Sequence, residues 1–505
     1  SRFPGQVTRE AVRTALYNAY RTNVGIQILE ADRGISDYNT LRQASCYALA
    51  DYLFDNAEGK LEAGGGEGDG EEEDKPENGY YSVFSTTSSV LAPGISQDIN
   101  YAMSADGKQM VYYVATVDVT RDDVTIKANY RDNDPSKGWG MQRVEDQVAA
   151  MVKNNKHVEN FTPVVATNGD GFNTTTGEPA GLLVMDGKVW KPIDGDGFFG
   201  ILKDGSAIVG TKAEYEALSD EVVEGIGAFG SGKFLVWDGQ LASGATDGTR
   251  ASRTAIGGKA DGSVVMMVLD GRQEPFSCGG SLREIAQIML EAGCVRAVNL
   301  DGGGSSTFLS QRPGEDLAIN CSPSDGAERP TTTGIFFIST APADGEFARA
   351  NITSDAQYYT PGSTVTFDVL GTDLVGNVAE IPEDVSWQLA DATMGTIENG
   401  VFVSNGKVGK ATAQMVYQGE VVGECTVEMV VPTGFSFSQS VMTVPFNKEV
   451  SLGLKATIND GLHEVVLKDS DVTIATTNDA LGVFNGLTFT SVSEDNAPAN
   501  LTSTV

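Results

Sequence analysis

Four short stretches in the middle of the chain combine acidic, basic, amide and hydroxyl side chains with glycine. They are Asn168-Gly169-Asp170-Gly171-Phe172-Asn173, Arg253-Thr254-Ala255-Ile256-Gly257, Asp270-Gly271-Arg272, and Asn299-Leu300-Asp301-Gly302-Gly303-Gly304-Ser305-Ser306-Thr307. A carboxylate can activate water, and an arginine can hold a phosphate through two parallel hydrogen bonds. Each stretch alone could be an ordinary turn, because Asn-Gly and Asp-Gly are common turn dipeptides. Together they indicate either a site for an anionic substrate or a set of salt bridges.

The fourth stretch carries the densest set of candidate ligand groups. Asp301 follows an apolar segment, AVNL, and precedes Gly302, Gly303 and Gly304. Glycines let the backbone come close to a ligand, and successive N–H groups can then face an anion. The hydroxyls of Ser305 and Ser306 add further donors. The loop has neither the G-x-x-x-x-G-K-S/T nor the G-x-G-x-x-G pattern, so it gives no specific support for nucleotide binding.

Strands and helices that alternate irregularly must position these side chains. Short runs of β-branched and aromatic residues, such as KQMVYYVATVDV and SVVMMVL, predict strands, and residues 140–155 and 281–293 show helical periodicity. Three of the four stretches place an aspartate at or near the end of an apolar strand, where sites gather in open α/β sheets. We therefore expect a mixed α/β or α+β catalytic domain over residues 80–340.

The rest of the chain predicts a multidomain protein. Residues 1–56 read as a helical segment, and residues 57–79 as an acidic, glycine-rich linker. After residue 341 short strands alternate with turns, which predicts an all-β, immunoglobulin-like sandwich over 341–432. A second, incomplete β module is expected over 433–505, because the pattern stops at LTSTV. Since the chain also begins without a methionine, we expect a piece of a longer protein.

The charge of the chain argues against two classes of partner. With 69 acidic and 35 basic residues the net charge is −34, and such a charge repels nucleic acid and anionic membrane surfaces. No stretch of about 18 apolar residues occurs, so we expect no membrane insertion. An anionic substrate must be held by local arginines, because the overall field opposes it.

Scarce histidine and scattered cysteine limit the chemistry further. Only His157 and His463 are available for a Ser-His-Asp triad or a histidine-rich zinc site, and the five cysteines form no C-x-x-C pair. We expect buried free thiols, although a Cys278–Cys321 bridge is conceivable. Calcium could be held by aspartates and carbonyls, but no D-x-D-x-D-G loop occurs. We therefore expect no required cofactor, and the sequence leaves metal binding open.

Taken in order, NGDGF, PAGLLVMDG, SRTAIG, VLDGR and SLREIAQIMLEAGCVRAVNLDGGGSST resemble the phosphodiester glycosidase family. The segment ERPTTTGIFF resembles the end of that domain. The resemblance covers roughly residues 90–340 and includes neither the N-terminal segment nor the β modules. It implies a hydrolase that cleaves the glycosyl-phosphate bond of a sugar phosphodiester, of the N-acetylglucosamine-1-phospho-glycan type, releasing the sugar and a phosphomonoester.

The resemblance also suggests roles for the individual residues. Asp301 is the first candidate for the carboxylate that activates water or stabilises the sugar cation, Asp170 the second and Asp270 the third. Asn168 would orient the sugar or the water. The phosphate would be held by a larger set: Arg253, Thr254, Arg272, Gly302, Gly303, Gly304, Ser305 and Ser306. Asp270 and Arg272 could instead pair with each other and fix the strand ends.

Two other functions remain open at this point. The same site could hydrolyse a cell-wall or capsular phosphoglycan, or the chain could be a surface adhesin that binds a phosphorylated glycan without cleaving it. The expected partner in each case is a glycan phosphodiester. An N-glycosylation pattern at Asn173 falls inside the proposed site, where a glycan would block the substrate. A bacterial protein, secreted or displayed at the cell surface, explains this more easily.

Overall fold

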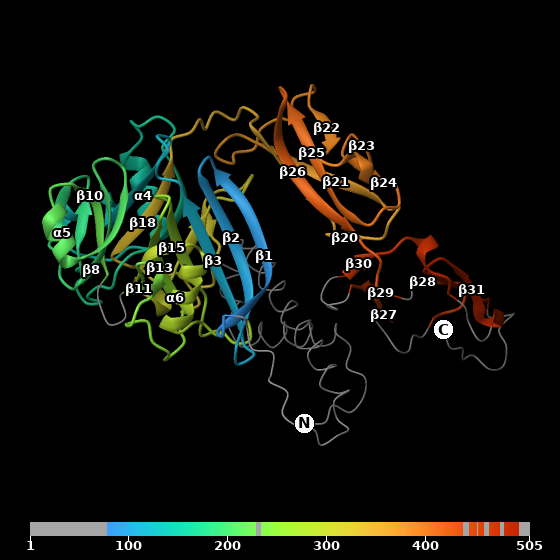
Figure 1. Ribbon diagram of the computed structural model, residues 1–505, viewed down its shortest axis with the longest axis horizontal. Helices are drawn as coiled ribbons and strands as arrows, with labels where there is room; N and C mark the ends of the chain where they lie inside the picture. The colour runs from blue at the N-terminus through green and yellow to red at the C-terminus, as the bar shows by residue number, and fades with distance from the viewer. Residues whose placement is uncertain are drawn as a thin grey trace, which may run out of the picture.

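The computed structural model describes residues 78–228, 234–437, 444–451, 453–458, 464–474 and 479–493 (Figure 1). The predicted helical segment 1–56 and nearly all of the predicted linker 57–79 lie outside these residues. Among the described helices, none is long and apolar enough to cross a membrane.

An eight-stranded antiparallel sheet forms one side of the domain that contains the four stretches. Its strand order is β1-β2-β3-β14-β13-β15-β11-β12. The bounds are β1 (Tyr81–Ala92), β2 (Ile95–Ser104), β3 (Gln109–Val117), β14 (Val264–Leu269), β13 (Arg253–Lys259), β15 (Cys294–Asn299), β11 (Phe234–Trp237) and β12 (Gln240–Leu241). The central strands are buried on both faces, which explains their nearly continuous apolar sequence, as in VVMMVL.

Two five-stranded antiparallel sheets complete the domain. One has the order β17-β16-β5-β18-β4 and the other β7-β6-β10-β8-β9. The first consists of β17 (Ala318–Ile319), β16 (Phe308–Ser310), β5 (Thr162–Asn168), β18 (Thr333–Ser339) and β4 (Val124–Tyr130). The second consists of β7 (Lys188–Lys191), β6 (Leu183–Met185), β10 (Val222–Ala228), β8 (Gly197–Leu202) and β9 (Ala207–Thr211).

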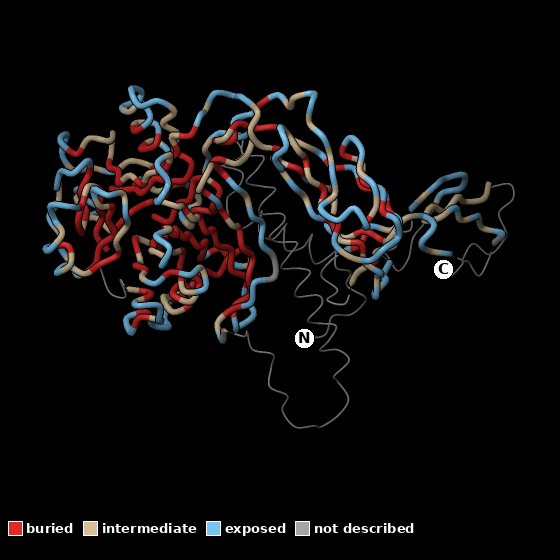
Figure 2. Tube along the Cα trace, turned by 45° about the horizontal axis from the view of Figure 1, so that its top comes forward, coloured by how far each residue is buried: buried red, intermediate tan, exposed pale blue. Residues whose placement is uncertain are grey.

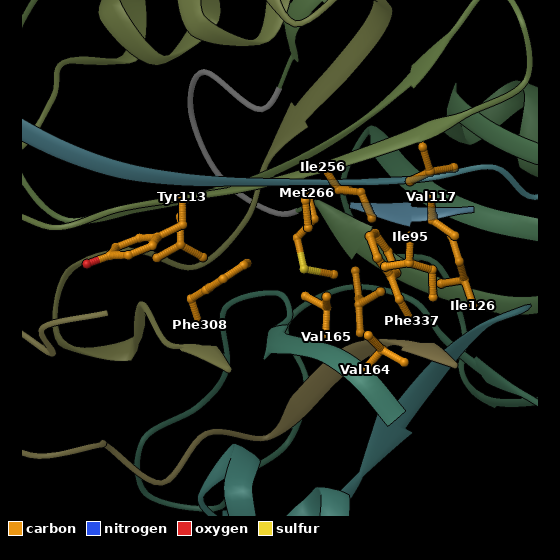
Figure 3. Close-up of a cluster of buried hydrophobic side chains, with 14 of the residues drawn as sticks. Ile95, Tyr113, Val117, Ile126, Val164, Val165, Ile256, Met266, Phe308 and Phe337 are labelled. Atoms are coloured by element: carbon orange, nitrogen blue, oxygen red, sulfur yellow. The ribbon is translucent and has the colours of Figure 1, made fainter. Parts of the chain in front are cut away.

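The main hydrophobic core lies between the eight-stranded sheet and the two smaller sheets (Figure 3). Ile256 and Met266 of the large sheet meet Val165 and Phe337 of the first small sheet, and all four are fully buried. Figure 2 shows this buried interior continuing through the domain. Face-to-face packing of sheets through such a layer fixes both sheets relative to each other, and therefore fixes the loops at their ends.

Three helices cover the outer faces of the sheets. Helix α6 (Leu282–Glu291) packs Ile285 and Met289 on the eight-stranded sheet. Helix α4 (Val144–Asn154) covers the sheet of β5, and α5 (Lys212–Leu218) covers the sheet of β8. A capping box of Ser281 and Glu284 begins α6. The two predicted helices are therefore confirmed.

The arrangement of elements fits the α+β form of the prediction and not the α/β form, with more strand than expected. Strands dominate, and every strand pair between residues 81 and 339 in the described ranges is antiparallel. Several of these pairs, such as β1–β2, β2–β3 and β13–β14, are joined directly by short hairpins, which connect antiparallel neighbours, whereas parallel strands need long crossovers.

Beyond residue 340 two sheets face each other across one core. One contains β19 (Arg349–Ser354), β21 (Thr364–Thr372), β24 (Val401–Ser404) and β23 (Gly395–Glu398). The other contains β22 (Ser386–Leu389), β25 (Gly409–Tyr417), β26 (Glu420–Met429), β20 (Tyr358–Tyr359), β30 (Glu464–Val466), β29 (Leu454–Thr457) and β27 (Gly434–Phe437). Ile352, Phe402 and Met415 belong to the core between them. The predicted β module is confirmed in its all-β character, and its immunoglobulin-like topology stays a prediction.

The predicted boundary near residue 433 falls within a continuous sheet. The short strand β20 pairs in parallel with β26 before that boundary and with β30 after it. A small sheet of β28 (Glu449–Ser451), β32 (Thr488–Ser491) and β31 (Gly482–Asn485) lies beyond. Residues 469–471, inside a segment read as β-like, form a 3-10 turn instead.

Candidate active site

Strand topology brings three of the four stretches to the same end of the central strands of the large sheet. Strand β13 runs antiparallel to both of its neighbours, with Arg253 opposite Leu269 and Ala255 opposite Asn299. The start of β13 therefore lies beside the ends of β14 and β15. Asp270 and Asp301 follow these two ends directly, so the antiparallel register gathers residues that are far apart in the sequence.

The first stretch reaches the same place from the smaller sheet. Asn168 ends β5 opposite Gly334 of β18, and Thr167 lies opposite Phe308, the first residue of β16. The loop 300–307 leaves β15 and enters β16, so it crosses from one sheet to the other at this edge. A hydrogen bond of 3.1 Å from the Asp301 amide to the Gly169 carbonyl ties this loop to the first stretch.

A pocket of about 390 Å³ opens at this junction. It is lined by Gly171, Ala251, Arg253, Arg272, Asn299, Leu300, Asp301, Gly302, Gly303, Gly304 and Arg329. Three arginines and one carboxylate are the charged members of this lining. The pocket is therefore locally positive in a chain whose net charge is −34.

Asp301 is the carboxylate of the pocket. Burial raises its pKa, while the Ser305 hydroxyl, the Arg329 charge and the Gly302 amide act in the opposite direction. A carboxylate with a raised pKa binds a proton more strongly than an exposed one, so it is a better base. The first catalytic candidate, Asp301, therefore lies in the pocket, and its catalytic role stays a prediction.

Arg253 and Arg272 project into the pocket without carboxylate neighbours. Arg253 donates to the carbonyls of Gly280 at 3.0 Å and Thr249 at 2.8 Å. Burial, and then the charge of Arg272, lower the pKa of Arg253. Within the described part of the chain, neither guanidinium has an acidic group within 4.0 Å. Two like charges held side by side in this way form a site that an anion would stabilise.

Backbone geometry aims Arg272 at the glycine loop. Its φ is 60°, in the left-handed region that non-glycine residues rarely adopt. The preceding Gly271 packs so closely that a methyl group there would lie 2.5 Å from the Ser252 amide nitrogen. A methyl group on Gly303, whose φ is 63°, would come within 3.2 Å of the Arg272 guanidinium. The guanidinium therefore lies directly against the loop.

The loop amides are used differently from the anion-facing arrangement that the glycines suggested. Gly303 N–H donates to the Ser252 carbonyl at 2.8 Å, and Ser305 and Ser306 N–H donate to carbonyls within the loop. The Gly302 amide faces the Asp301 carboxylate. These amides hold the loop and Asp301 in place, so the arginines are the principal phosphate ligands that the pocket offers.

Asn168, Thr254 and Ser306 form a buried layer beneath the loop, outside the pocket lining. Asn168 Nδ2 donates to the Asp301 carbonyl at 2.8 Å, and its Oδ1 accepts from Thr254 Oγ1 at 2.9 Å and from the Thr307 amide at 3.1 Å. Thr254 Oγ1 also lies within hydrogen-bond distance of Ser306 Oγ, at 3.2 Å. This geometry gives Asn168 the role of positioning the loop, in place of direct contact with sugar or water.

The second and third carboxylate candidates also lie outside the pocket lining. Asp170 accepts from the Gly171 amide at 2.7 Å, and its Oδ2 faces the α-carbons of Gly181 and Gly227. Asp270 accepts from the Ser322 amide at 2.8 Å and from Tyr113 Oη at 3.0 Å. Both are almost completely buried. The structure thus separates Asp301 from the other two aspartates.

Two polar residues of the lining, Arg329 and Asn299, had no role among the sequence-based candidates, although Asn299 belongs to the fourth stretch. Arg329 lies four residues before the start of β18, and it belongs to ERPTTTGIFF, where a charge close to an apolar strand is the available signal. Asn299 ends β15; its Nδ2 donates to the Leu300 carbonyl at 2.9 Å, and its Oδ1 is buried with no hydrogen-bond donor in the described structure. That oxygen can accept a hydrogen bond from a ligand.

Cysteine and metal ligands do not enter this site. Cys278, Cys294 and Cys321 are free and buried, as expected, and Cys425 is free and partly buried. In the described ranges, no group of three or more histidine, cysteine, aspartate or glutamate side chains is arranged to hold a metal ion.

Comparison with known proteins finds relatives of this part of the chain. Residues 161–338 match the family model described as phosphodiester glycosidase. Over 209 residues the chain is 31% identical to the SPbeta prophage-derived uncharacterized protein YomE of Bacillus subtilis, covering 39% of this chain and 30% of that protein. Over 164 residues it is 30% identical to the mouse N-acetylglucosamine-1-phosphodiester alpha-N-acetylglucosaminidase, covering 29% and 31%.

The human enzyme of the same name is 30% identical over 169 residues. The chain spans only about 30% of the length of these curated relatives. Among solved structures, the catalytic domain of the zebrafish enzyme shares 21% identity at a TM-score of 0.38, covering 51% of this chain and 87% of that chain. The segment from residue 161 to residue 338 is a phosphodiester glycosidase domain.

Proposed function

We propose that this chain hydrolyses the bond between a sugar and a phosphate in a glycan phosphodiester. The observation that carries the proposal is that one pocket combines Asp301 with Arg253 and Arg272, whose guanidinium groups have no acidic group within 4.0 Å among the described residues. A phosphodiester supplies the anion that these arginines lack. The N-acetylglucosamine-1-phospho-glycan type is the substrate that the named relatives suggest.

In the proposed reaction, water attacks the anomeric carbon while the bond from that carbon to the phosphate oxygen breaks. The sugar passes through an oxocarbenium-like state, and Asp301 accepts the proton of the attacking water. The electron pair of the broken bond stays on the phosphate oxygen. The products are the free sugar and a phosphomonoester, and the proton that Asp301 accepted is later released to solvent.

The arginines act on the leaving group. A phosphomonoester is a much better leaving group than a sugar alkoxide, so protonation of the leaving oxygen is less important than in ordinary glycosidases. Arg253 and Arg272 stabilise the charge that develops there, in a position fixed before the reaction begins. The Asn299 Oδ1 would accept a hydrogen bond from a hydroxyl of the sugar.

Product analysis tests this proposal directly. The protein is incubated with an α-N-acetylglucosaminyl phosphodiester of a mannoside, and the expected products are N-acetylglucosamine and a mannoside phosphomonoester. Release of N-acetylglucosamine 1-phosphate would show that the other phosphate ester bond is cut and would contradict the mechanism. Activity only on a cell-wall or capsular phosphoglycan would keep the reaction and change the substrate.

A non-catalytic adhesin is distinguished by the Asp301→Asn variant. An enzyme loses turnover when this carboxylate is removed, whereas a binding protein keeps its affinity and shows no turnover even in the unmodified chain. Secretion by, or display on, a bacterium remains part of the proposal and is tested by locating the protein in fractionated cells.

A further inference from the structure

An ion pair of Asp325 and Arg329 lies over the glycine loop, next to the pocket. The Asp325 carboxylate accepts from Arg329 Nε at 2.8 Å and lies 2.6 Å from Arg329 Nη2. Arg329 Nη1 also donates to Ser305 Oγ at 3.4 Å. The Ser305 hydroxyl in turn favours the ionised form of the Asp301 carboxyl and so lowers its pKa. Arg329 and Asp301 line the same pocket, and Ser305 lies between them in the contacts that the ion pair makes.

Gly304 makes this arrangement possible. A methyl group on its α-carbon would overlap both the Arg329 guanidinium and the Asp325 carboxylate. The ion pair is about 40% exposed on each side, and such pairs contribute roughly 0–1 kcal/mol to stability. The small gain in stability therefore does not explain the glycine at position 304, which leaves room for the ion pair. The contact of Arg329 with Ser305 suggests a role in the pocket instead.

We propose that Asp325 and Arg329 are positioning residues that set the electrostatic environment of Asp301, acting through the Ser305 hydroxyl. The inference rests on the proposed function of Asp301 as the proton acceptor. Other charged groups face the same region and must be held constant: Arg253 at the start of β13, Arg272 after β14 and Asp170 after β5.

The two residues act on Asp301 in opposite directions. Arg329 favours the ionised carboxylate and so lowers its pKa, against the effect of burial. Asp325 neutralises part of the Arg329 charge, so it limits that effect. Removing the charge of Asp325 should therefore lower the pKa of Asp301, and removing that of Arg329 should raise it.

The experiment compares Asp325→Asn and Arg329→Gln by the pH dependence of kcat/KM. The acid limb of the profile should move to lower pH in Asp325→Asn and to higher pH in Arg329→Gln, each by roughly one unit. Arg329→Lys should return the limb most of the way to its original position. Shifts in the same direction, or equal losses of kcat at every pH, would show a merely structural role and overturn the proposal.

The chain offers a closely matched control. Arg121 and Asp123 form an ion pair of the same kind, with two bonds of 2.7 Å, at the opposite end of the sheets. Asp123→Asn should leave the pH profile unchanged.

A second readout separates this inference from the proposed function. Selective ¹³C labelling of aspartate carboxyls, with Asp301→Asn used to assign the signal, follows the titration of Asp301 without any substrate. If no phosphodiester is cleaved but the two variants shift this titration in opposite directions, the proposed function fails and the electrostatic coupling holds. If turnover is normal and the titration does not move, only the coupling fails.

Discussion

At the scale of single residues, the three aspartates should have different roles. Asp301→Asn should lower kcat roughly 10²- to 10⁴-fold, because a positioned proton acceptor contributes about that factor, and should leave the melting temperature nearly unchanged. Asp270→Asn should instead destabilise the fold by about 1–3 kcal/mol, because the carboxylate accepts from the buried Ser322 amide and from Tyr113. Kinetics and thermal unfolding of both variants check this. Equal losses of activity at normal stability would contradict it.

Substitution of a pocket arginine should lower kcat/KM through weaker binding of the substrate phosphate. Arg272 is exposed apart from its contact with the loop, so Arg272→Ala should cost little stability. It removes a charge-assisted contact worth about 1.5–3 kcal/mol, and we expect kcat/KM to fall roughly 10- to 100-fold. Arg272→Lys should recover only part of this, because an ammonium cannot form two parallel bonds to phosphate. Arg121→Ala, far from the pocket, provides the control; an effect of equal size there would argue against a phosphate contact.

At the scale of elements, a buried glutamate connects pH to stability. Glu328 holds the start of α4 by accepting from the Val144 amide and, at 3.3 Å, from the Glu145 amide. Burial raises its pKa to about 7, and the two amides oppose this only in part. The folded chain therefore holds a proton that the unfolded chain has released above about pH 4.3. Stability from this group is complete below that pH and is lost as the pH rises through about 7.

Glu328→Gln should remove this dependence, since the amide oxygen can still accept from Val144. Relative to the unmodified chain, we expect the variant to gain stability between pH 5 and pH 8, by at most about 3 kcal/mol. Thermal unfolding at the two pH values measures the change. Glu159→Gln, at an exposed position in the same domain, controls for the loss of one charge. An identical pH dependence in all three proteins would show that the pKa of Glu328 is not raised in the folded chain.

Sequence reasoning succeeded where the signal is local. The helix after Ser281 could be predicted because its cap, its apolar spacing and its terminal glycine all lie within thirteen residues, and the aspartates after β14 and β15 follow recognisable strands. It could not show that Asn168 turns beneath the loop, because the direction of a side chain after a strand depends on the partner sheet. Arg329 was missed for the same reason: only the pairing of β18 with β5 brings it to the pocket.

At the scale of the whole molecule, the β module is attached at the end of the domain away from the pocket. Val375, in the loop after β21, is fully buried in the main core of the domain. Arg349 of β19 donates to the Leu91 carbonyl at 3.0 Å. Leu91 closes the hairpin of β1 and β2, near the level of Val264, whereas the pocket lies beyond Leu269. Five residues along a strand separate these levels by about 17 Å.

This arrangement predicts that a substitution can weaken the contact between the β module and the catalytic domain without changing catalysis. Val375→Ala should destabilise the chain by about 2 kcal/mol, because two buried methyl groups are lost and a cavity remains, which lowers the melting temperature by roughly 4–8 °C. At temperatures where the variant is folded, kcat/KM should stay within about twofold of the unmodified value. Val378→Ala, in the same loop but 62% exposed, should change neither quantity. A loss of kcat/KM in Val375→Ala below its melting temperature would mean that the module influences the pocket through the shared core, and would contradict the prediction.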